Sequence, residues 1–262
     1  MKRLAIYSII RKDIRGITVN TRLFASIWIV PIIFTVFFPS IFVFSIHMMP
    51  DDPDFIKLLE QFPASLQMES TELSIIALIA NYILPVFFLM IPIMTASIMA
   101  ASAFVGEKER RTLETLLYCP LTLKEIFRAK VLASFLLSMF VSLSSFLVML
   151  IVLEVEVFFL MGSLLVPGIS WLIVMLLIAP AISLIAITLI VRGSAKAKSV
   201  EEAQQSAVFL VIPIILLFVG QFSGVLFLGN WVLLGLGILC AGAAFVLLLQ
   251  SMKHFTYEKL LK

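Results

Sequence analysis

The feature that most constrains the fold of this chain is a series of long apolar segments. Six segments of about 20 to 33 residues contain no Asp, Glu, Lys or Arg. A helix needs about 20 apolar residues to cross the hydrocarbon core of a bilayer. We therefore predict an all-α integral membrane protein with about six transmembrane helices. The predicted spans are Leu23–His47, Leu73–Val105, Val131–Leu153, Leu164–Val191, Ser206–Leu228 and Trp231–Gln250.

The composition agrees with a membrane protein and leaves little room for anything else. Of 262 residues, 62% are apolar and 13% are charged, whereas soluble domains are about half apolar and a quarter charged. Six spans and short loops use up the length, so we expect no soluble catalytic domain. The second span is too long for one bilayer crossing, so it should tilt, kink at Pro85 or Pro92, or project. Glu154 and Glu156 predict a short turn after the third span, and Gly229 and Asn230 predict a tight turn between the last two spans. These two spans fit either full crossings or a re-entrant hairpin.

The first 18 residues predict an N-terminal amphipathic interfacial helix. Its isoleucines recur at helical spacing, while Arg11 and Arg15 fall on another side. Such a helix binds anionic headgroups through one face and the acyl boundary through the other. The alternative is an irregular lead-in to the first span. The isoleucines that make the pattern are Ile6, Ile10, Ile14 and Ile17.

The distribution of Lys and Arg predicts the orientation. Of the 19 Lys and Arg residues, 18 lie in the N-terminal segment, in 106–130, in 192–205 or after Gln250, and only Lys57 lies on the opposite side. The 16 acidic residues divide equally between the two sides. Segments rich in Lys and Arg stay in the cytoplasm. We therefore expect a multi-pass protein of the cell (inner) membrane with both termini cytoplasmic.

The residues needed for catalysis, cofactor binding or metal binding are missing. No ionisable residue lies near the middle of a predicted span, as proton-coupled or ion-coupled carriers usually require. The chain has two histidines and no Gly-Lys dipeptide, so it lacks a phosphate-binding loop of the Walker type. Cys119 and Cys240 form no metal or disulfide pattern. We predict no catalytic, cofactor or metal residues, so energy for uphill transport must come from a partner.

Small hydroxyl residues mark one face of the third predicted span. Small residues of this kind allow close packing between membrane helices. The same face could instead form a substrate path, and the sequence leaves both interpretations open. The residues of this face are Ser134, Ser138, Ser142 and Ser145.

The segment from Gly106 to Lys130 is the one substantial charged loop. From Glu107 to Tyr118 it predicts a helix with a short stripe of leucines, and Pro120 ends that helix. Thr122 and Glu125 then match a capping box that begins the next helix. A short amphipathic helix between two spans can dock into a groove on a soluble partner, or it can be a solvated loop.

This loop resembles the cytoplasmic loop of type-2 ABC transporter permeases. The family pattern is roughly Glu-Lys/Arg-Glu-Arg-Gly-Thr-Leu-Glu-x-Leu-Leu-x-x-Pro, followed by a Thr or Ser, then Glu-Ile and a Lys. Arg111 stands where the family commonly has Gly. Ala203-Gln204-Gln205 is similar to a later loop of the family, and the N-terminal helix is similar to its elbow helix. The matching residues are Glu107, Lys108, Glu109, Arg110, Thr112, Leu113, Glu114, Leu116, Leu117, Pro120, Leu121, Thr122, Glu125, Ile126 and Lys130.

The resemblance implies one transmembrane permease domain over 1–262, with an elbow helix at 1–18 and a coupling loop at 106–130. Its implied partners are a cytoplasmic ATP-binding subunit, a second permease copy (homodimer or related heterodimer) and membrane lipids, with no nucleic acid. ATP and Mg²⁺ would be held by the ATP-binding subunit. The residues implied to dock on that subunit are Glu107, Arg110, Thr112, Leu113, Glu114, Leu116, Leu117 and Pro120.

The function expected from this resemblance is that of the membrane-spanning subunit of an ATP-driven ABC exporter, which is not itself an enzyme. The alternative is a non-transporting immunity or sensor subunit of the same fold. A membrane-embedded lipid-modifying enzyme is disfavoured because ionisable side chains do not cluster in the spans.

Overall fold

A computed structural model gives the fold of the chain. Six helical stretches are long and apolar enough to cross a membrane, and the described part of the chain contains no strand. The chain is therefore an all-α integral membrane protein, as predicted. These stretches, spans 1 to 6, are Leu23–Met48, Thr71–Glu109, Leu123–Met161, Ile169–Gly193, Val200–Phe222 and Asn230–Met252. The structure describes residues 2–50, 52–60, 70–109, 121–194, 197, 199–226 and 228–254.

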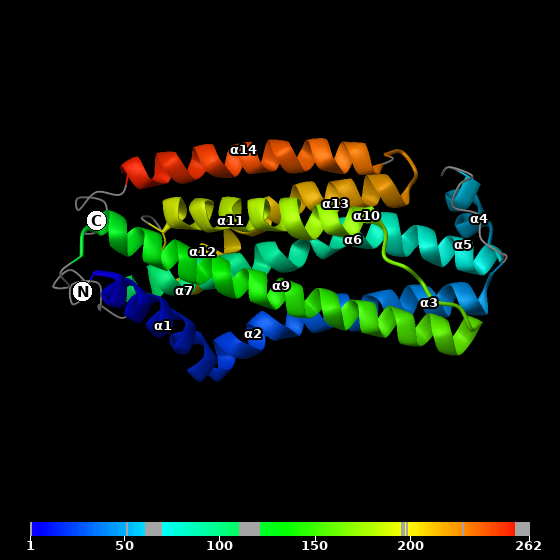
Figure 1. The fold of residues 1–262 in the computed structure, drawn as a ribbon, viewed down its shortest axis with the longest axis horizontal. Helices are drawn as coiled ribbons and strands as arrows, with labels where there is room; N and C mark the ends of the chain where they lie inside the picture. The colour runs from blue at the N-terminus through cyan, green and yellow to red at the C-terminus, as the bar shows by residue number, and fades with distance from the viewer. Residues whose placement is uncertain are drawn as a thin grey trace.

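The spans run side by side along the long axis of the molecule (Figure 1). Helix α1 (Lys2–Val19) precedes span 1, and α4 (Pro53–Glu60) lies between spans 1 and 2. Both α1 and the C-terminal end of α14 lie at the same end of the bundle. The elements of the spans are α2 (Thr21–Ile32), η1 (Ile33–Phe37), α3 (Phe38–Met48), α5 (Thr71–Leu78), η3 (Ile79–Ile83), α6 (Leu84–Phe88), α7 (Met90–Glu109), α9 (Leu123–Met161), α10 (Ile169–Ile173), η4 (Val174–Ile178), α11 (Ala179–Gly193), α12 (Val200–Gln205), α13 (Val208–Phe222) and α14 (Asn230–His254).

Each of the widened π-turns η1, η3 and η4 ends two residues before a proline, namely Pro39, Pro85 and Pro180. In each case the residue before the proline donates its N–H to the carbonyl oxygen five residues back. Proline has no N–H, and its ring presses on the carbonyl four residues back. Widening the turn relieves this contact and keeps most backbone groups paired inside the membrane. Span 2 is thus interrupted just before Pro85, one of the two predicted kink positions.

Side chains from spans 4 and 5 bind the carbonyl groups at η3. Trp171 Nε1 donates to the Ala80 oxygen at 2.9 Å, and Gln221 Nε2 donates to the Tyr82 oxygen at 2.9 Å. The Ser170 hydroxyl donates to the carbonyl oxygen of Asn81. An unpaired carbonyl is costly in lipid, so these bonds compensate for the irregular turn. They also fix spans 4 and 5 against span 2.

Span 2 lies at the centre of the packing. Its helices contact α1, α2, α3, α9, α11, α12 and α13, and most of its side chains are buried. Aromatic rings join spans 1, 2 and 5: Phe87 stacks on Phe38 at a centroid distance of 3.9 Å and contacts Phe218 at 4.9 Å. By contrast, α14 packs on α10, η4 and α11 and forms the outer edge of the bundle in Figure 1.

The two sides of span 3 differ in side-chain size and in burial. Large side chains such as Phe140, Leu147 and Ile151 are exposed on α9, as expected for a surface that meets lipid. By contrast, Ser134, Ser138, Ser142 and Ser145 of the same helix point inward and are buried. The helix is also longer than predicted, because it passes through Glu154 and Glu156 and ends only at Gly162, whose φ of 67° caps it. The prediction of a turn at these two glutamates was wrong.

The later spans differ from the prediction at their ends. Span 4 begins at Ile169 rather than Leu164. Span 5 ends at Phe222 rather than Leu228, where Gly224 takes a φ of 73° that favours glycine. The chain between spans 5 and 6 is therefore longer than the predicted tight turn at Gly229 and Asn230. Hydropathy does not separate apolar loop residues from apolar helix residues, which explains both errors.

Candidate functional site: the ends of the charged loop and the serine face

Both ends of the predicted coupling loop are ordered helices. On one side α7 continues to Glu109, and on the other side α9 begins after Thr122. The predicted capping box is present: Thr122 accepts the Glu125 N–H, and the Glu125 carboxylate accepts the Thr122 N–H at 2.8 Å. The predicted docking residues Arg110, Thr112, Leu113, Glu114, Leu116, Leu117 and Pro120 lie outside the described residues.

Glu107, the remaining predicted docking residue, lies in a group of four charged side chains, here named the charged cluster: Lys12, Asp13, Glu107 and Lys130. The Lys130 ammonium lies 2.7 Å from Glu107 and 3.9 Å from Asp13. Lys12 donates to Glu107 and lies 3.5 Å from Asp13. The cluster joins α1 to the end of α7 and the start of α9.

Most of the charged cluster is shielded from solvent. Asp13, Glu107 and Lys130 are 8%, 7% and 3% exposed. Lys130 also donates to the Ala103 carbonyl and lies 5.5 Å from the centre of the Phe104 ring. Burial raises the pKa of the Asp13 carboxyl, an effect that the charges of Lys130 and Lys12 only partly offset. Two cations and two anions balance one another, as buried charges require.

The end of α7 also contacts the loop that follows span 4. Ser199 caps α12, and the Glu109 carboxylate accepts the Val200 N–H at 3.2 Å. A negative charge at a helix N-terminus is favourable. Gly106 faces Val200: an added Cβ would stand 3.5 Å from the Val200 side chain, in ordinary van der Waals contact. The two predicted cytoplasmic loops are thus joined at their bases.

Arg192 joins two further helices, α11 and α14, at the same end of the bundle. Its guanidinium donates to Ser251 at 3.0 Å, to Gln250 at 2.9 Å and to the Leu247 carbonyl at 3.3 Å. These bonds tie the end of α11 to the end of α14. The described helix ends that border the Lys- and Arg-rich segments therefore all lie at this one end of the bundle.

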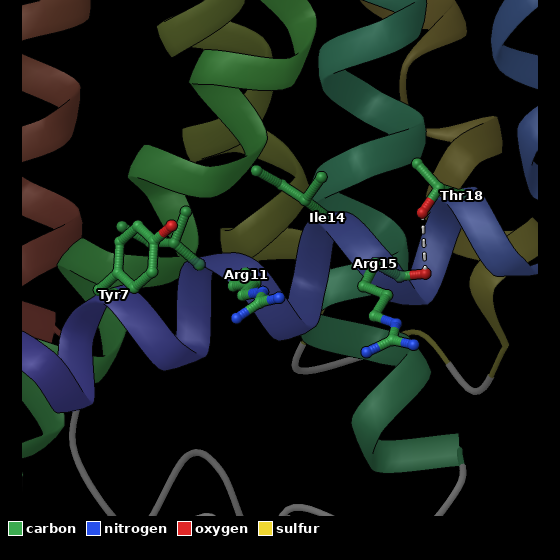
Figure 2. Close-up of a pocket in the computed structure, with 6 residues that line it drawn as sticks. Tyr7, Arg11, Ile14, Arg15 and Thr18 are labelled. Atoms are coloured by element: carbon green, nitrogen blue, oxygen red, sulfur yellow. Dashed lines mark hydrogen bonds between the residues drawn. The ribbon is translucent and has the colours of Figure 1, made fainter.

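The outer side of α1 carries a shallow basic surface. In Figure 2 the side chains of Arg11 and Arg15 point away from the neighbouring helices, whereas Ile14 points toward them. Thr18 donates to the Arg15 carbonyl at 3.2 Å. The arrangement suits an anionic group held at the surface. A hollow of about 280 Å³ here is lined by Tyr7, Ile10, Arg11, Ile14, Arg15 and Thr18.

The serine face of α9 is packed inside the bundle. The Ser138 hydroxyl is hydrogen-bonded to the Pro92 carbonyl at 3.1 Å, to Thr95 at 3.2 Å and to Ser183 at 3.3 Å, so it joins spans 2, 3 and 4. The other serines of the face have no hydrogen-bond partner within the part of the chain that the structure describes. A path along this face requires neighbouring spans to separate. These other serines are Ser134, Ser142 and Ser145, each at most 2% exposed.

Sequence reasoning missed the charged cluster, although one signal of it was present. Asp13 is the only acidic residue in α1. It stands between the buried Ile9 and Ile17 at intervals of four residues, so all three share one side of the helix. An acid at that place indicates a buried cationic partner. The identity of that partner depends on tertiary contacts that local spacing does not reveal.

The described residues contain no group of His, Cys, Asp or Glu that could hold a metal ion. A model of the family described as ABC-2 family transporter protein matches residues 7–255. This range includes most of α1, all six spans and the two charged loops. A search of curated proteins and a search of solved structures found no match.

Proposed function

The chain belongs to the ABC-2 family of transporter proteins, and from this premise we propose that it is the membrane-spanning subunit of an ATP-driven exporter. A membrane subunit of this family has no ATPase site of its own. Energy would therefore enter from a separate cytoplasmic ATP-binding subunit that holds ATP and Mg²⁺. The permease would convert movement of that subunit into rearrangement of its spans.

The arrangement of the charged loop carries this proposal. Its two ends are the rigid helices α7 and α9, which reach deep into the bundle. The charged cluster holds these ends together, and Glu109 joins them to α12. A partner bound to the loop would thus transmit its movement directly to spans 2 and 3. The leucines of the loop, Leu113, Leu116 and Leu117, lie outside the described residues; they would supply an apolar docking face, where burial of apolar surface favours binding.

The orientation is part of the proposal. Helix α1, the loop ends and the end of α14 share one end of the bundle (Figure 1). The chain segments that begin or end there contain 18 of the 19 Lys and Arg residues of the sequence, which favours the cytoplasm. We therefore assign both termini to the cytoplasm and the protein to the inner membrane. There, Arg11 and Arg15 of α1 would face anionic lipid headgroups.

We further infer that two permease copies, identical or related, assemble with two ATP-binding subunits. In the single chain the serine face is closed by packing and hydrogen bonds. A path past Ser134, Ser138, Ser142 and Ser145 would open when spans 2, 3 and 4 separate. A second copy would supply the facing wall of such a path.

The test is to isolate the tagged chain from its native membrane and assay ATP hydrolysis. We expect an ATP-binding subunit to co-purify and to account for all of the activity. A substitution in the Walker lysine of that subunit should abolish hydrolysis, while the permease alone should have none. Recovery of the permease without any ATP-binding subunit, under conditions that preserve other membrane complexes, would refute the proposal.

A further inference from the structure

The charged cluster lies at the base of the coupling loop. Glu107 stands at the beginning of the 106–130 loop, in the last turn of α7, and Lys130 stands at its end, in the first turns of α9. Their ion pair at 2.7 Å closes the base of the loop. Lys12 and Asp13 of α1 contact these same two residues. Three elements that are distant in sequence therefore meet at one point beside the loop.

The four charges of the cluster contribute to the positions of the helices more than to the stability of the fold. Replacing a buried ion pair with apolar side chains of similar volume is often neutral or stabilising. Stability alone therefore gives no reason for four charges here. What a buried ion network supplies is a specific arrangement, because each charge is costly unless its partner is in place. The cluster penalises any displacement of α1 from the base of the loop.

Helix α1 is attached to the rest of the chain by further contacts besides the charged cluster. Ile9 packs with Ile126 and Ala129 in a small apolar group that is separate from the main core. At the other end of α1, Asn20 forms a hydrogen-bonded corner with span 1: its N–H donates to the Ile17 carbonyl, and its own carbonyl accepts the Phe24 N–H. A movement of α1 is thereby passed to α2.

We propose that the charged cluster makes α1 and the base of the coupling loop one rigid unit, which carries displacement of the loop to span 1. This inference rests on the proposed function, because it assumes that an ATP-binding subunit moves the loop. Asp13, Glu107 and Lys130 act as positioning residues, which hold the elbow helix to the loop and touch no substrate. Span 1 would then move with spans 2 and 3.

The test measures the distance between α1 and the start of α9 in the assembled complex. Spin labels at Arg15→Cys and Arg128→Cys report it, since both side chains are exposed. The background is Cys119→Ser/Cys240→Ser, and spectra are recorded without nucleotide and with a non-hydrolysable ATP analogue. We expect the same distance in both states for the intact cluster. A distance that changes on nucleotide binding would overturn the inference.

A second variant removes the two charges that α1 contributes and keeps the packing: Lys12→Met/Asp13→Leu. The ion pair between Glu107 and Lys130 stays in place. We expect this variant to bind the ATP-binding subunit and to show a distance that shifts or broadens with nucleotide. Lys124→Met, which removes an exposed charge of α9 nearby, should behave as the parent. A constant distance in the double variant would overturn the inference.

The two proposals fail in different ways. If no ATP-binding subunit co-purifies with the parent chain, the proposed function falls, and this inference falls with it. If the complex forms and hydrolyses ATP but the label distance responds to nucleotide in the parent, only the inference falls. If the double variant does not fold, the parent measurement still decides.

Discussion

At the scale of single residues, polar groups in this chain occur where helices must be held in fixed relation. Ser138 joins spans 2, 3 and 4 through three hydrogen bonds. Arg192 joins spans 4 and 6. In an apolar medium there is no hydrophobic force between helices, so small and polar residues determine how they associate. Many large apolar side chains instead face outward, as on α9, where they meet lipid.

The docking leucines give the first prediction. If Leu116 fills an apolar groove on the ATP-binding subunit, Leu116→Asp places a carboxylate against apolar surface when the two proteins bind. Docking should weaken by several kcal/mol, because an unpaired charge at an interface keeps its desolvation cost. Pull-down of the ATP-binding subunit with a tagged permease measures the loss.

Two controls accompany Leu116→Asp. Its amount in the membrane should equal that of the parent, because the proposed topology puts the loop outside the bilayer. Glu114→Lys, a charge change in the same segment, should weaken docking by about 1 kcal/mol or less, as for an exposed ion pair. Full retention of the ATP-binding subunit by Leu116→Asp would show that the loop is only a connector.

The second prediction at this scale concerns Trp171. Trp171→Phe keeps an aromatic ring in contact with Phe88 and Phe146 but removes the donor to the Ala80 carbonyl. Hydrogen bonds between membrane helices contribute about 1 kcal/mol. We expect the free energy of unfolding in detergent to fall by about that amount. Trp231→Phe, at a side chain that is 86% exposed, is the matched control and should have no measurable effect.

At the scale of elements, the sequence predicted which segments are helices better than where they end. The capping box at Thr122 is a local signal, and it was confirmed. The end of span 3 was not, because Glu154 and Glu156 indicated a turn. Both have a partner that is distant in sequence: Glu154 accepts the Leu165 N–H at 3.3 Å, and Ser40 donates to one oxygen of Glu156. The other oxygen of Glu156 has no hydrogen-bond partner among the described residues. A partner that is distant in sequence overrides the local preference.

The three π-turns follow from a signal in the sequence, a proline inside a long apolar segment, which predicted an interruption but not its form. Each precedes a proline inside a long apolar segment, at Pro39, Pro85 or Pro180. The missing N–H of proline predicts an interruption. Whether a helix kinks or widens depends on what can bind the freed carbonyls. At η3 those donors are Trp171, Ser170 and Gln221, from other spans, and only the tertiary structure reveals them.

At the scale of the whole molecule, the charge bias and the even number of spans both predicted that the termini share a side. The structure places α1 and the end of α14 at one end of the bundle (Figure 1). By contrast, the charged cluster could not be predicted. Lys12, Asp13, Glu107 and Lys130 come from three separate segments, and no local spacing relates them.

The topology gives a third prediction, whose test determines which end of the bundle faces the cytoplasm. In a Cys119→Ser/Cys240→Ser background, Lys57→Cys should react with an impermeant thiol reagent added to intact cells, since α4 lies at the opposite end from α1 (Figure 1). Arg110→Cys should react only after the membrane is permeabilised, which also shows that its thiol is reactive. Labelling of position 110 in intact cells would contradict the proposed orientation.

The central claim is that this chain works as one of two membrane subunits driven by two ATP-binding subunits. Native mass measurement of the complex, isolated through a tag on the permease, tests it most directly. We expect a mass equal to two permease chains, each 29.2 kDa if identical, plus two ATP-binding subunits. A fully active complex that contains one permease chain and no second, related one would contradict the claim.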